Sequence, residues 1–218
     1  MRRVLAVDVG GQHVKFLLQG EPERRRFASS EALGAERMVR RVLAEAAGWE
    51  WDVVSIGVPA PVVGGRIAVE PVNLGEGWAG FDFEAAFGKP TKVINDAAMQ
   101  ALGSYRGDGR MLFLGLGTGL GSSFVSDGKV EPMELGHFPY RKKTWEDYVG
   151  EAGRLKLGRK RWEAIVHELV ENLRVALAPD EIVLGGGNAE KLKELPEGAR
   201  LGANANAFLG GFALWRED

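Results

Sequence analysis

"LGLGTGLGSS", residues 114–123, places glycine at every second position between two apolar runs. A dinucleotide-binding loop needs the spacing GxGxxG followed by a helix, and a Walker loop needs Lys and Ser or Thr after its glycines. This stretch meets neither requirement. Its spacing is GxGxGxG, the strand-like run "SSFVSDG" follows in place of a helix, and the Lys with Ser or Thr that a Walker loop needs is missing. The pattern therefore predicts a hairpin joined by Thr118, Gly119 and Leu120. Its backbone N–H groups, unobstructed by Cβ atoms, can form an anion-binding concavity, and a plain β-turn is the alternative.

A second glycine hairpin is predicted near the N-terminus, about half the chain length away. "RVLAVDV" and "HVKFLLQ" are apolar, β-branched runs joined by Gly10, Gly11 and Gln12. Asp8 adds a carboxylate to this hairpin, and Lys15 adds a cation. Similar hairpins at this separation indicate two lobes of related build. Two such hairpins facing each other across a cleft would hold a polyphosphate chain from both sides.

The remaining segments predict a mixed α/β chain with short connections. A helix is expected within residues 31–48, and its apolar face is formed by Met38, Val39, Val42, Leu43 and Ala46. A strand begins at residue 53 and runs into prolines, and a buried strand from residue 91 ends at Asn95. Asp96 is placed to cap the helix that follows. Further helices are expected over 159–178 and from 206 onward, with a strand before the glycines at 185–187.

These elements suggest a division of the chain into two lobes. Residues 1–95 are expected to form an N-terminal α/β lobe. Residues 96–204 are expected to form a C-terminal α/β lobe. The C-terminal helix, about 205–218, is expected to pack back onto the N-terminal lobe.

Composition excludes several classes of function. The 218 residues include no cysteine, which excludes disulfides, a thiol nucleophile and thiolate zinc sites. The net charge of −2 gives no electrostatic footprint for nucleic acid or an anionic membrane. Asp8 interrupts the first apolar run before it reaches the length of a signal peptide core, and no stretch approaches the roughly 20 apolar residues that span a bilayer. The composition therefore predicts a cytoplasmic protein without nucleic-acid or membrane partners.

Six motifs occur along the chain in this order: "AVDVGGQHVK", "VINDAAMQA", "LGLGTGLGSS", "MELGH", "TWEDY" and "IVLGGG". Together they resemble the ROK family of sugar kinases, within the actin-like ATPase superfamily. "VEPVNLGEGWAG", "ELGHFPY" and "GANANAFLGGFALW" are similar to segments of its polyphosphate-dependent glucokinase branch. The resemblance covers essentially the whole chain. It implies an α/β actin-like ATPase fold, also called ribonuclease H-like, with two lobes around a central cleft.

The resemblance also implies a role for each matching residue. Asp96 would be the general base that takes the proton of the sugar's 6-hydroxyl. The sugar would be bound by Asn73, Asn95, Asp96, Glu134, His137 and Glu146. Phosphate or nucleotide would be bound by Asp8, Gly10, Gly11, Gln12, Lys15, Gly117, Thr118, Gly119, Gly185, Gly186 and Gly187. Asp8 would also hold Mg²⁺ through water, since Mg²⁺ keeps several waters and takes few protein carboxylates.

The implied reaction transfers a phosphoryl group to the 6-hydroxyl of glucose or a similar hexose. Polyphosphate and ATP both stay open as donors, and the family usually has Ser or Thr where this chain has Gln12, followed here by His13. No zinc is expected, because residues 140–148 lack cysteine. A homodimer is expected, as in relatives. The alternatives are a non-catalytic sugar- or phosphate-binding ROK protein and a ROK kinase for an N-acetylated amino sugar.

Overall fold

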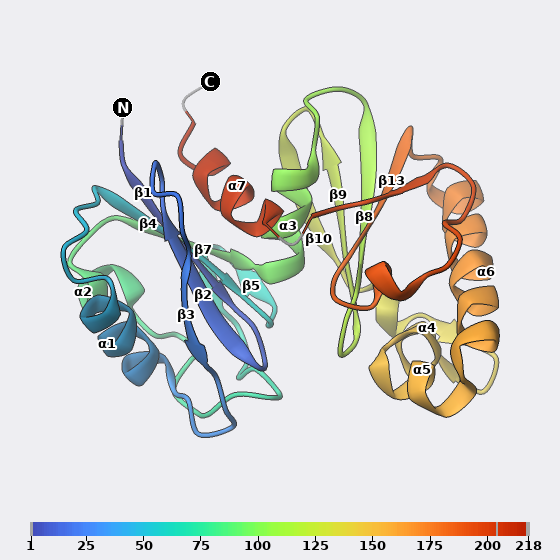
Figure 1. The fold of residues 1–218 in the computed structure, drawn as a ribbon, viewed down its shortest axis with the longest axis horizontal. Helices are drawn as coiled ribbons and strands as arrows, with labels where there is room; N and C mark the ends of the chain where they lie inside the picture. The colour runs from blue at the N-terminus through green and yellow to red at the C-terminus, as the bar shows by residue number, and fades with distance from the viewer. Residues whose placement is uncertain (1, 204, 217–218) are drawn as a thin grey trace. The chain divides into compact units, whose positions relative to one another are not determined.

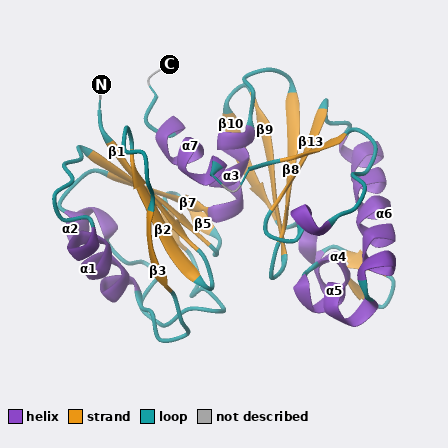
Figure 2. Ribbon diagram, in the orientation of Figure 1, coloured by secondary structure: helices purple, strands orange, loops and turns teal. Residues whose placement is uncertain are grey.

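The computed structural model describes residues 2–203 and 205–216, so residues 1, 204, 217 and 218 lie outside it. The chain forms two compact units. Unit 1 contains the residues up to Met99 and those from Ala207 onward, and unit 2 contains Gln100–Asn206. The chain passes from unit 1 to unit 2 within helix α3 (Asp96–Ser104), drawn in green in Figure 1. Figure 2 shows the helices of both units in purple and their strands in orange.

Unit 1 is built on a five-stranded sheet in the order β3-β2-β1-β4-β7. Its strands are β1 (Val4–Val9), β2 (His13–Leu18), β3 (Arg25–Ala28), β4 (Val53–Val58) and β7 (Thr91–Asn95). The first three strands form an antiparallel meander, whereas β4 pairs in parallel with both β1 and β7. The carboxyl ends of β1, β4 and β7 therefore meet at one edge of the sheet. A short ribbon of β5 (Val62–Val63) and β6 (Arg66–Ile67) follows β4.

The two faces of this sheet are covered differently. Helices α1 (Ala35–Glu45) and α2 (Phe83–Phe87) lie on one face, as Figure 1 shows. There the alternate residues Leu5, Val7 and Val9 join the apolar core. On the other face, helix α7 (Asn206–Ala213) approaches β1 and β4 so closely that a Cβ on Gly211 would lie 2.8 Å from the Cβ of Ala6. The Ser55 hydroxyl donates a 2.6 Å hydrogen bond to the Gly211 carbonyl on this face.

Unit 2 repeats this plan with a five-stranded sheet in the order β10-β9-β8-β13-β14. Its strands are β8 (Arg110–Leu116), β9 (Leu120–Ser126), β10 (Lys129–Met133), β13 (Glu181–Gly185) and β14 (Ala199–Leu201). The first three are again antiparallel, and β13 is parallel to both β8 and β14. The long helix α6 (Arg159–Leu177) buries Trp162, Val166 and Leu169 in the core of this unit.

A smaller subassembly is inserted in unit 2 between β10 and α6. It consists of η1 (Leu135–His137), β11 (Pro139–Tyr140), β12 (Lys143–Thr144), α4 (Trp145–Val149) and α5 (Glu151–Leu157). Tyr140 stacks on Trp145 with 3.7 Å between ring centroids, and its hydroxyl donates a 2.6 Å hydrogen bond to Glu168. Burial and the Glu168 carboxylate raise the pKa of Tyr140 to about 12. The short turn η2 (Ala189–Lys191) follows β13.

The α/β class and both predicted hairpins are confirmed, and three details of the sequence prediction are wrong. Leu120 is the first residue of β9, so the second turn consists of residues 117–119. Strand β7 is only half-buried, because it lies at the edge of its sheet. Leu43 is 36% exposed at the margin of the apolar face of α1.

Gly211→Ala is expected to lower the free energy of unfolding by about 1–2 kcal/mol, because the added methyl group overpacks against Ala6. At an unobstructed helix position the same change would stabilise by about 1 kcal/mol, so the sign is informative. Leu209→Ala, at a 50% exposed position of the same helix, is the control. We expect it to change stability by no more than about 0.5 kcal/mol. Urea denaturation measures both, and a Gly211→Ala protein as stable as wild type would contradict this packing.

Candidate functional site

The first turn joins β1 to β2 and presents two unpaired backbone donors. The Gly10 N–H donates to the His13 carbonyl at 3.0 Å, and the Ser29 hydroxyl donates to the Gly10 carbonyl at 2.6 Å. Within the part of the chain that the structure describes, the N–H groups of Gly11 and Gln12 have no hydrogen-bond acceptor. Both residues are exposed. This turn can therefore donate two hydrogen bonds to an anion.

Asn73 lies beside this turn. A Cβ on Gly11 would be 3.8 Å from the Cβ of Asn73, whose side chain is exposed. The loop that carries Asn73 is held close to the segment before α1: a Cβ on Gly75 would lie 2.9 Å from backbone atoms of residues 32–34. The structure thus brings the predicted sugar-binding amide next to the predicted phosphate-binding turn of unit 1.

Asp8 and Lys15 face each other across the β1–β2 pair. They are register partners, and the Lys15 Nζ lies 3.5 Å from Asp8 Oδ2. Asp8 is only 5% exposed, and this burial raises its pKa, although Lys15 acts in the opposite direction. Among the described residues, no three His, Cys, Asp or Glu side chains are grouped to hold a metal ion. A single carboxylate can supply one ligand to Mg²⁺, directly or through water, with water and substrate phosphates completing the coordination.

Asn95 and Asp96 stand at the carboxyl end of β7, where α3 begins. Asn95 Oδ1 accepts a 3.1 Å hydrogen bond from the Ala98 N–H, so Asn95 caps the helix. The prediction that Asp96 is the cap is wrong, because Asp96 is already the first helical residue and its Oδ1 accepts from the adjacent Ala97 N–H at 2.8 Å. The Asp96 side chain is half-buried. Its carboxylate sits at the first turn of a helix, where the helix dipole favours negative charge.

A glycine on the intervening strand brings Asp96 close to the strand that carries Asp8. Gly57 on β4 is the register partner of Asp8. A Cβ on Gly57 would lie 2.6 Å from the Met99 side chain and 3.3 Å from the Asp96 Cα. The two carboxylates therefore stand at the same edge of the unit 1 sheet, with one strand between them.

The second turn, Gly117–Gly119, repeats the features of the first. The Gly117 N–H donates to the Gly119 carbonyl at 3.1 Å. Across residues 2–203 and 205–216, no acceptor is present for the N–H groups of Thr118 and Gly119. This turn also offers two backbone donors to an anion.

The predicted sugar-binding residues of unit 2 lie in two places. Glu134 precedes η1 and His137 is its last residue; their side chains are 60% and 68% exposed, with His137 Nδ1 3.9 Å from Glu134 Oε2. Glu146 on α4 instead contacts the second hairpin, because its Oε2 accepts a 3.0 Å hydrogen bond from the Leu120 N–H. A Cβ on Gly136 would lie 2.8 Å from the Leu120 carbonyl and 3.5 Å from the Glu146 Cβ. The "ELGH" and "WEDY" motifs therefore meet at the base of the second turn.

Three glycines stand at the end of β13, and each has a different environment. A Cβ on Gly185 would lie 2.4 Å from the Phe113 ring, and a Cβ on Gly186 would lie 2.3 Å from the Leu116 carbonyl. Gly186 also has φ +79°, which favours glycine. Gly187 is exposed and has open space around its Cα. Of the three, Gly185 is buried, Gly186 is half-buried and Gly187 is exposed.

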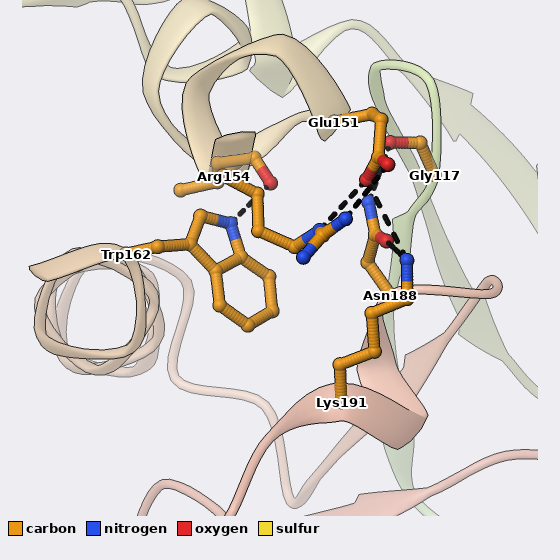
Figure 3. Close-up of polar contacts among 7 residues, drawn as sticks. Gly117, Glu151, Arg154, Trp162, Asn188 and Lys191 are labelled. Atoms are coloured by element: carbon orange, nitrogen blue, oxygen red, sulfur yellow. Dashed lines mark hydrogen bonds and ion pairs between the residues drawn. The ribbon is translucent and has the colours of Figure 1, made fainter. Parts of the chain in front are cut away.

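The motif prediction missed a polar network behind the second turn, shown in Figure 3. Arg154 makes two 2.8 Å hydrogen bonds to the Glu151 carboxylate, and Lys191 lies 3.6 Å from it. Asn188, which is 3% exposed, donates through Nδ2 to the Gly117 carbonyl at 3.0 Å. The Arg154 hydrogen bonds, assisted by Asn188 and Lys191, lower the pKa of Glu151 to about 2. The only sequence signal was the i, i+3 spacing of Glu151 and Arg154.

Gly119→Ala is expected to displace the Glu146 carboxylate, since the new Cβ would lie 2.1 Å from Oε2. Loss of the Leu120 hydrogen bond should cost about 1 kcal/mol of unfolding free energy. Glu146→Ala removes the displaced group, so the double variant should be no less stable than Glu146→Ala alone. A double-mutant cycle by urea denaturation measures this coupling. Strictly additive effects would contradict the contact.

The low pKa of Glu151 predicts a pH dependence. An ordinary Glu titrates near pH 4.3. Because folding favours the Glu151 carboxylate, its contribution is present above that pH and is lost as the pH falls toward about 2. The melting temperature of Glu151→Gln should therefore fall less steeply than that of wild type between about pH 5 and about pH 2. Exposed Glu23→Gln is the control for removal of one carboxylate, and parallel curves for Glu151→Gln and wild type would refute the assignment.

No helix in residues 2–203 and 205–216 combines the length and the apolar character needed to cross a bilayer.

No protein-family model matches the chain. The polyphosphate glucokinase of Mycobacterium leprae (strain TN) is 26% identical over 171 residues, which are 70% of this chain and 52% of that protein. The chain thus spans about half the length of this curated relative.

Solved structures match over nearly the full chain. The inorganic polyphosphate/ATP-glucomannokinase from Arthrobacter sp. strain KM is 22% identical, with a TM-score of 0.84 over 98% of both chains. A ROK family glucokinase from Streptomyces griseus, solved with glucose and AMPPNP, is 17% identical, with a TM-score of 0.78 over 97% of this chain and 98% of that one. These matches agree with the resemblance expected from the motifs: the chain has the fold of the ROK sugar kinases.

Proposed function

We propose that this chain is a sugar kinase that transfers a phosphoryl group from polyphosphate or ATP to the 6-hydroxyl of glucose or a similar hexose. The observation that carries the proposal is the placement of Asp96. Its carboxylate stands at the same sheet edge as Asp8 and the first turn, with free backbone donors close by in unit 1. The names of the similar proteins, a polyphosphate glucokinase and a polyphosphate/ATP-glucomannokinase, support the same reaction class.

In unit 1, Asp96 would accept the proton of the 6-hydroxyl as that oxygen attacks the terminal phosphorus. Phosphoryl transfer has a loose transition state, so alignment of the nucleophile and stabilisation of charge provide most of the rate. Asn73 and Asn95 would bind sugar hydroxyls. Gly10, Gly11, Gln12 and Lys15 would bind the donor's phosphates. Asp8 would hold Mg²⁺ through water, and the ion would neutralise phosphate charge.

In unit 2, the N–H groups of the second turn would bind phosphate, with Gly117, Thr118 and Gly119 as its residues. Gly185, Gly186 and Gly187 would lie near a nucleotide donor, and Gly187 is the most exposed of the three. Glu134 and His137 are exposed and carry polar groups suited to sugar hydroxyls. Glu146 would contact the sugar through the oxygen that does not accept from Leu120. A cytoplasmic homodimer without nucleic-acid, membrane or zinc partners is part of the same proposal.

Asp96→Asn is expected to lower kcat by roughly a hundredfold or more, because an amide cannot accept the proton. The amide keeps an oxygen for the Ala97 N–H, so the melting temperature should stay near that of wild type. A coupled assay over glucose, mannose, fructose and N-acetyl sugars, each with ATP and polyphosphate, measures the rates. Exposed Asp108→Asn is the control. An unchanged rate for Asp96→Asn would remove Asp96 as the base, and no turnover by wild type with any pair would favour a non-catalytic binding protein.

A further inference from the structure

Two carbonyl groups of the second turn, those of Gly117 and Thr118, accept hydrogen bonds from residues outside the turn. The Gly117 carbonyl accepts hydrogen bonds from the Glu151 N–H at 3.0 Å and from Asn188 Nδ2 at 3.0 Å. The Thr118 carbonyl accepts from the same Glu151 N–H at 3.2 Å. Figure 3 shows Gly117, Asn188 and Glu151 converging at this point. The side of the turn that carries its carbonyls is therefore fixed by the protein.

The fixed carbonyls determine where the unpaired N–H groups point. A peptide unit is planar and trans, so its C=O and N–H bonds point in opposite directions. The Gly117 carbonyl shares a peptide unit with the Thr118 N–H, and the Thr118 carbonyl shares one with the Gly119 N–H. Holding these two carbonyls toward Asn188 and Glu151 directs both N–H groups to the opposite side of the turn. Thr118 is exposed and Gly119 is half-buried.

Asn188 is itself held in place by hydrogen bonds on its backbone and on its side chain. Its backbone N–H donates to the Leu116 carbonyl at 2.9 Å, at the end of β8. Its Oδ1 accepts a 2.6 Å hydrogen bond from Lys191 Nζ, which fixes which end of the amide faces Gly117. The Glu151 side of the contact is held as well, because Trp162 Nε1 donates to the carbonyl of Val149 at 2.7 Å, just before α5.

We infer that Asn188 is a positioning residue: its side chain orients the Thr118 and Gly119 N–H groups toward the phosphates of the phosphoryl donor. This inference rests on the proposed function, because it takes the donor as the anion. The role needs an amide. Aspartate would keep an oxygen for Lys191, but it would place a second negatively polarised oxygen against the Gly117 carbonyl, and alanine would leave that carbonyl with the Glu151 N–H alone.

The test measures donor binding in the absence of sugar, using the full chain. Calorimetric titration with tripolyphosphate and with ATP should show affinities about tenfold weaker in Asn188→Asp, which corresponds to about 1.4 kcal/mol. Asn188→Ala, which introduces no charge, should show a smaller loss in the same direction and serves if the aspartate variant fails to fold. Asn206→Asp is the matched control, because Asn206 Nδ2 donates a 2.9 Å hydrogen bond to Ser104 Oγ elsewhere in unit 2.

A general structural defect would affect both substrates, whereas a positioning defect affects the donor. In the kinase assay, the KM for the donor should rise in the Asn188 variants while the KM for the hexose stays near the wild-type value. Variants that bind both probes as tightly as wild type would overturn the inference alone. A wild-type chain that binds the probes but phosphorylates no sugar would overturn only the proposed function. A wild-type chain that binds neither probe would overturn both.

Discussion

The second turn depends on how closely three backbone segments approach each other. A Cβ on Gly150 would lie 2.7 Å from the Thr118 carbonyl and 3.3 Å from the Gly119 Cα. A Cβ on Gly119 would collide with the Glu146 carboxylate. Because these positions are glycine, α4 and α5 can contact the hairpin directly, and the backbone N–H of Glu151 reaches two of its carbonyls. The positions of the Thr118 and Gly119 N–H groups in unit 2 therefore depend on the contact of α4 and α5 with the hairpin.

Unit 1 reaches the same arrangement with different chemistry. In unit 1, Ser29 binds the turn in the way that Asn188 and Glu151 bind the turn of unit 2. Its hydroxyl donates to the Gly10 carbonyl, and its N–H donates to the Gln12 carbonyl. The Gly10 carbonyl shares a peptide unit with the Gly11 N–H, so the hydroxyl directs that N–H away from β3 by the same geometry. In each turn, two carbonyls thus accept hydrogen bonds from residues outside the turn. Among the described residues, two N–H groups of each turn have no acceptor. The similarity extends beyond the glycines to the way the peptide planes are fixed.

The sequence predicted those features that depend on local pattern. Alternating apolar runs and glycines specify both hairpins, and the motif order predicts the fold. Local pattern did not distinguish Asn95 from Asp96 as the cap, because both side chains suit that position and the choice depends on where the helical turn begins. It gave no signal for Asn188 either. The amide acts on Gly117, far away in sequence, and the contact exists only because parallel β8 and β13 end at the same edge.

The two carboxylates at the sheet edge of unit 1 have different surroundings. Asp8, on β1, is buried, and this burial raises its pKa because the charged form is poorly solvated. Lys15 compensates only in part, since its ammonium lies 3.5 Å from one carboxylate oxygen. A further positive charge near Asp8 would therefore favour ionisation. Asp96, one strand away and half-buried, lies in the first turn of α3, and its Oδ1 accepts a hydrogen bond from the Ala97 N–H. The two carboxylates therefore differ in their surroundings: Asp8 is buried beside the Lys15 ammonium, whereas Asp96 is half-buried at the start of a helix.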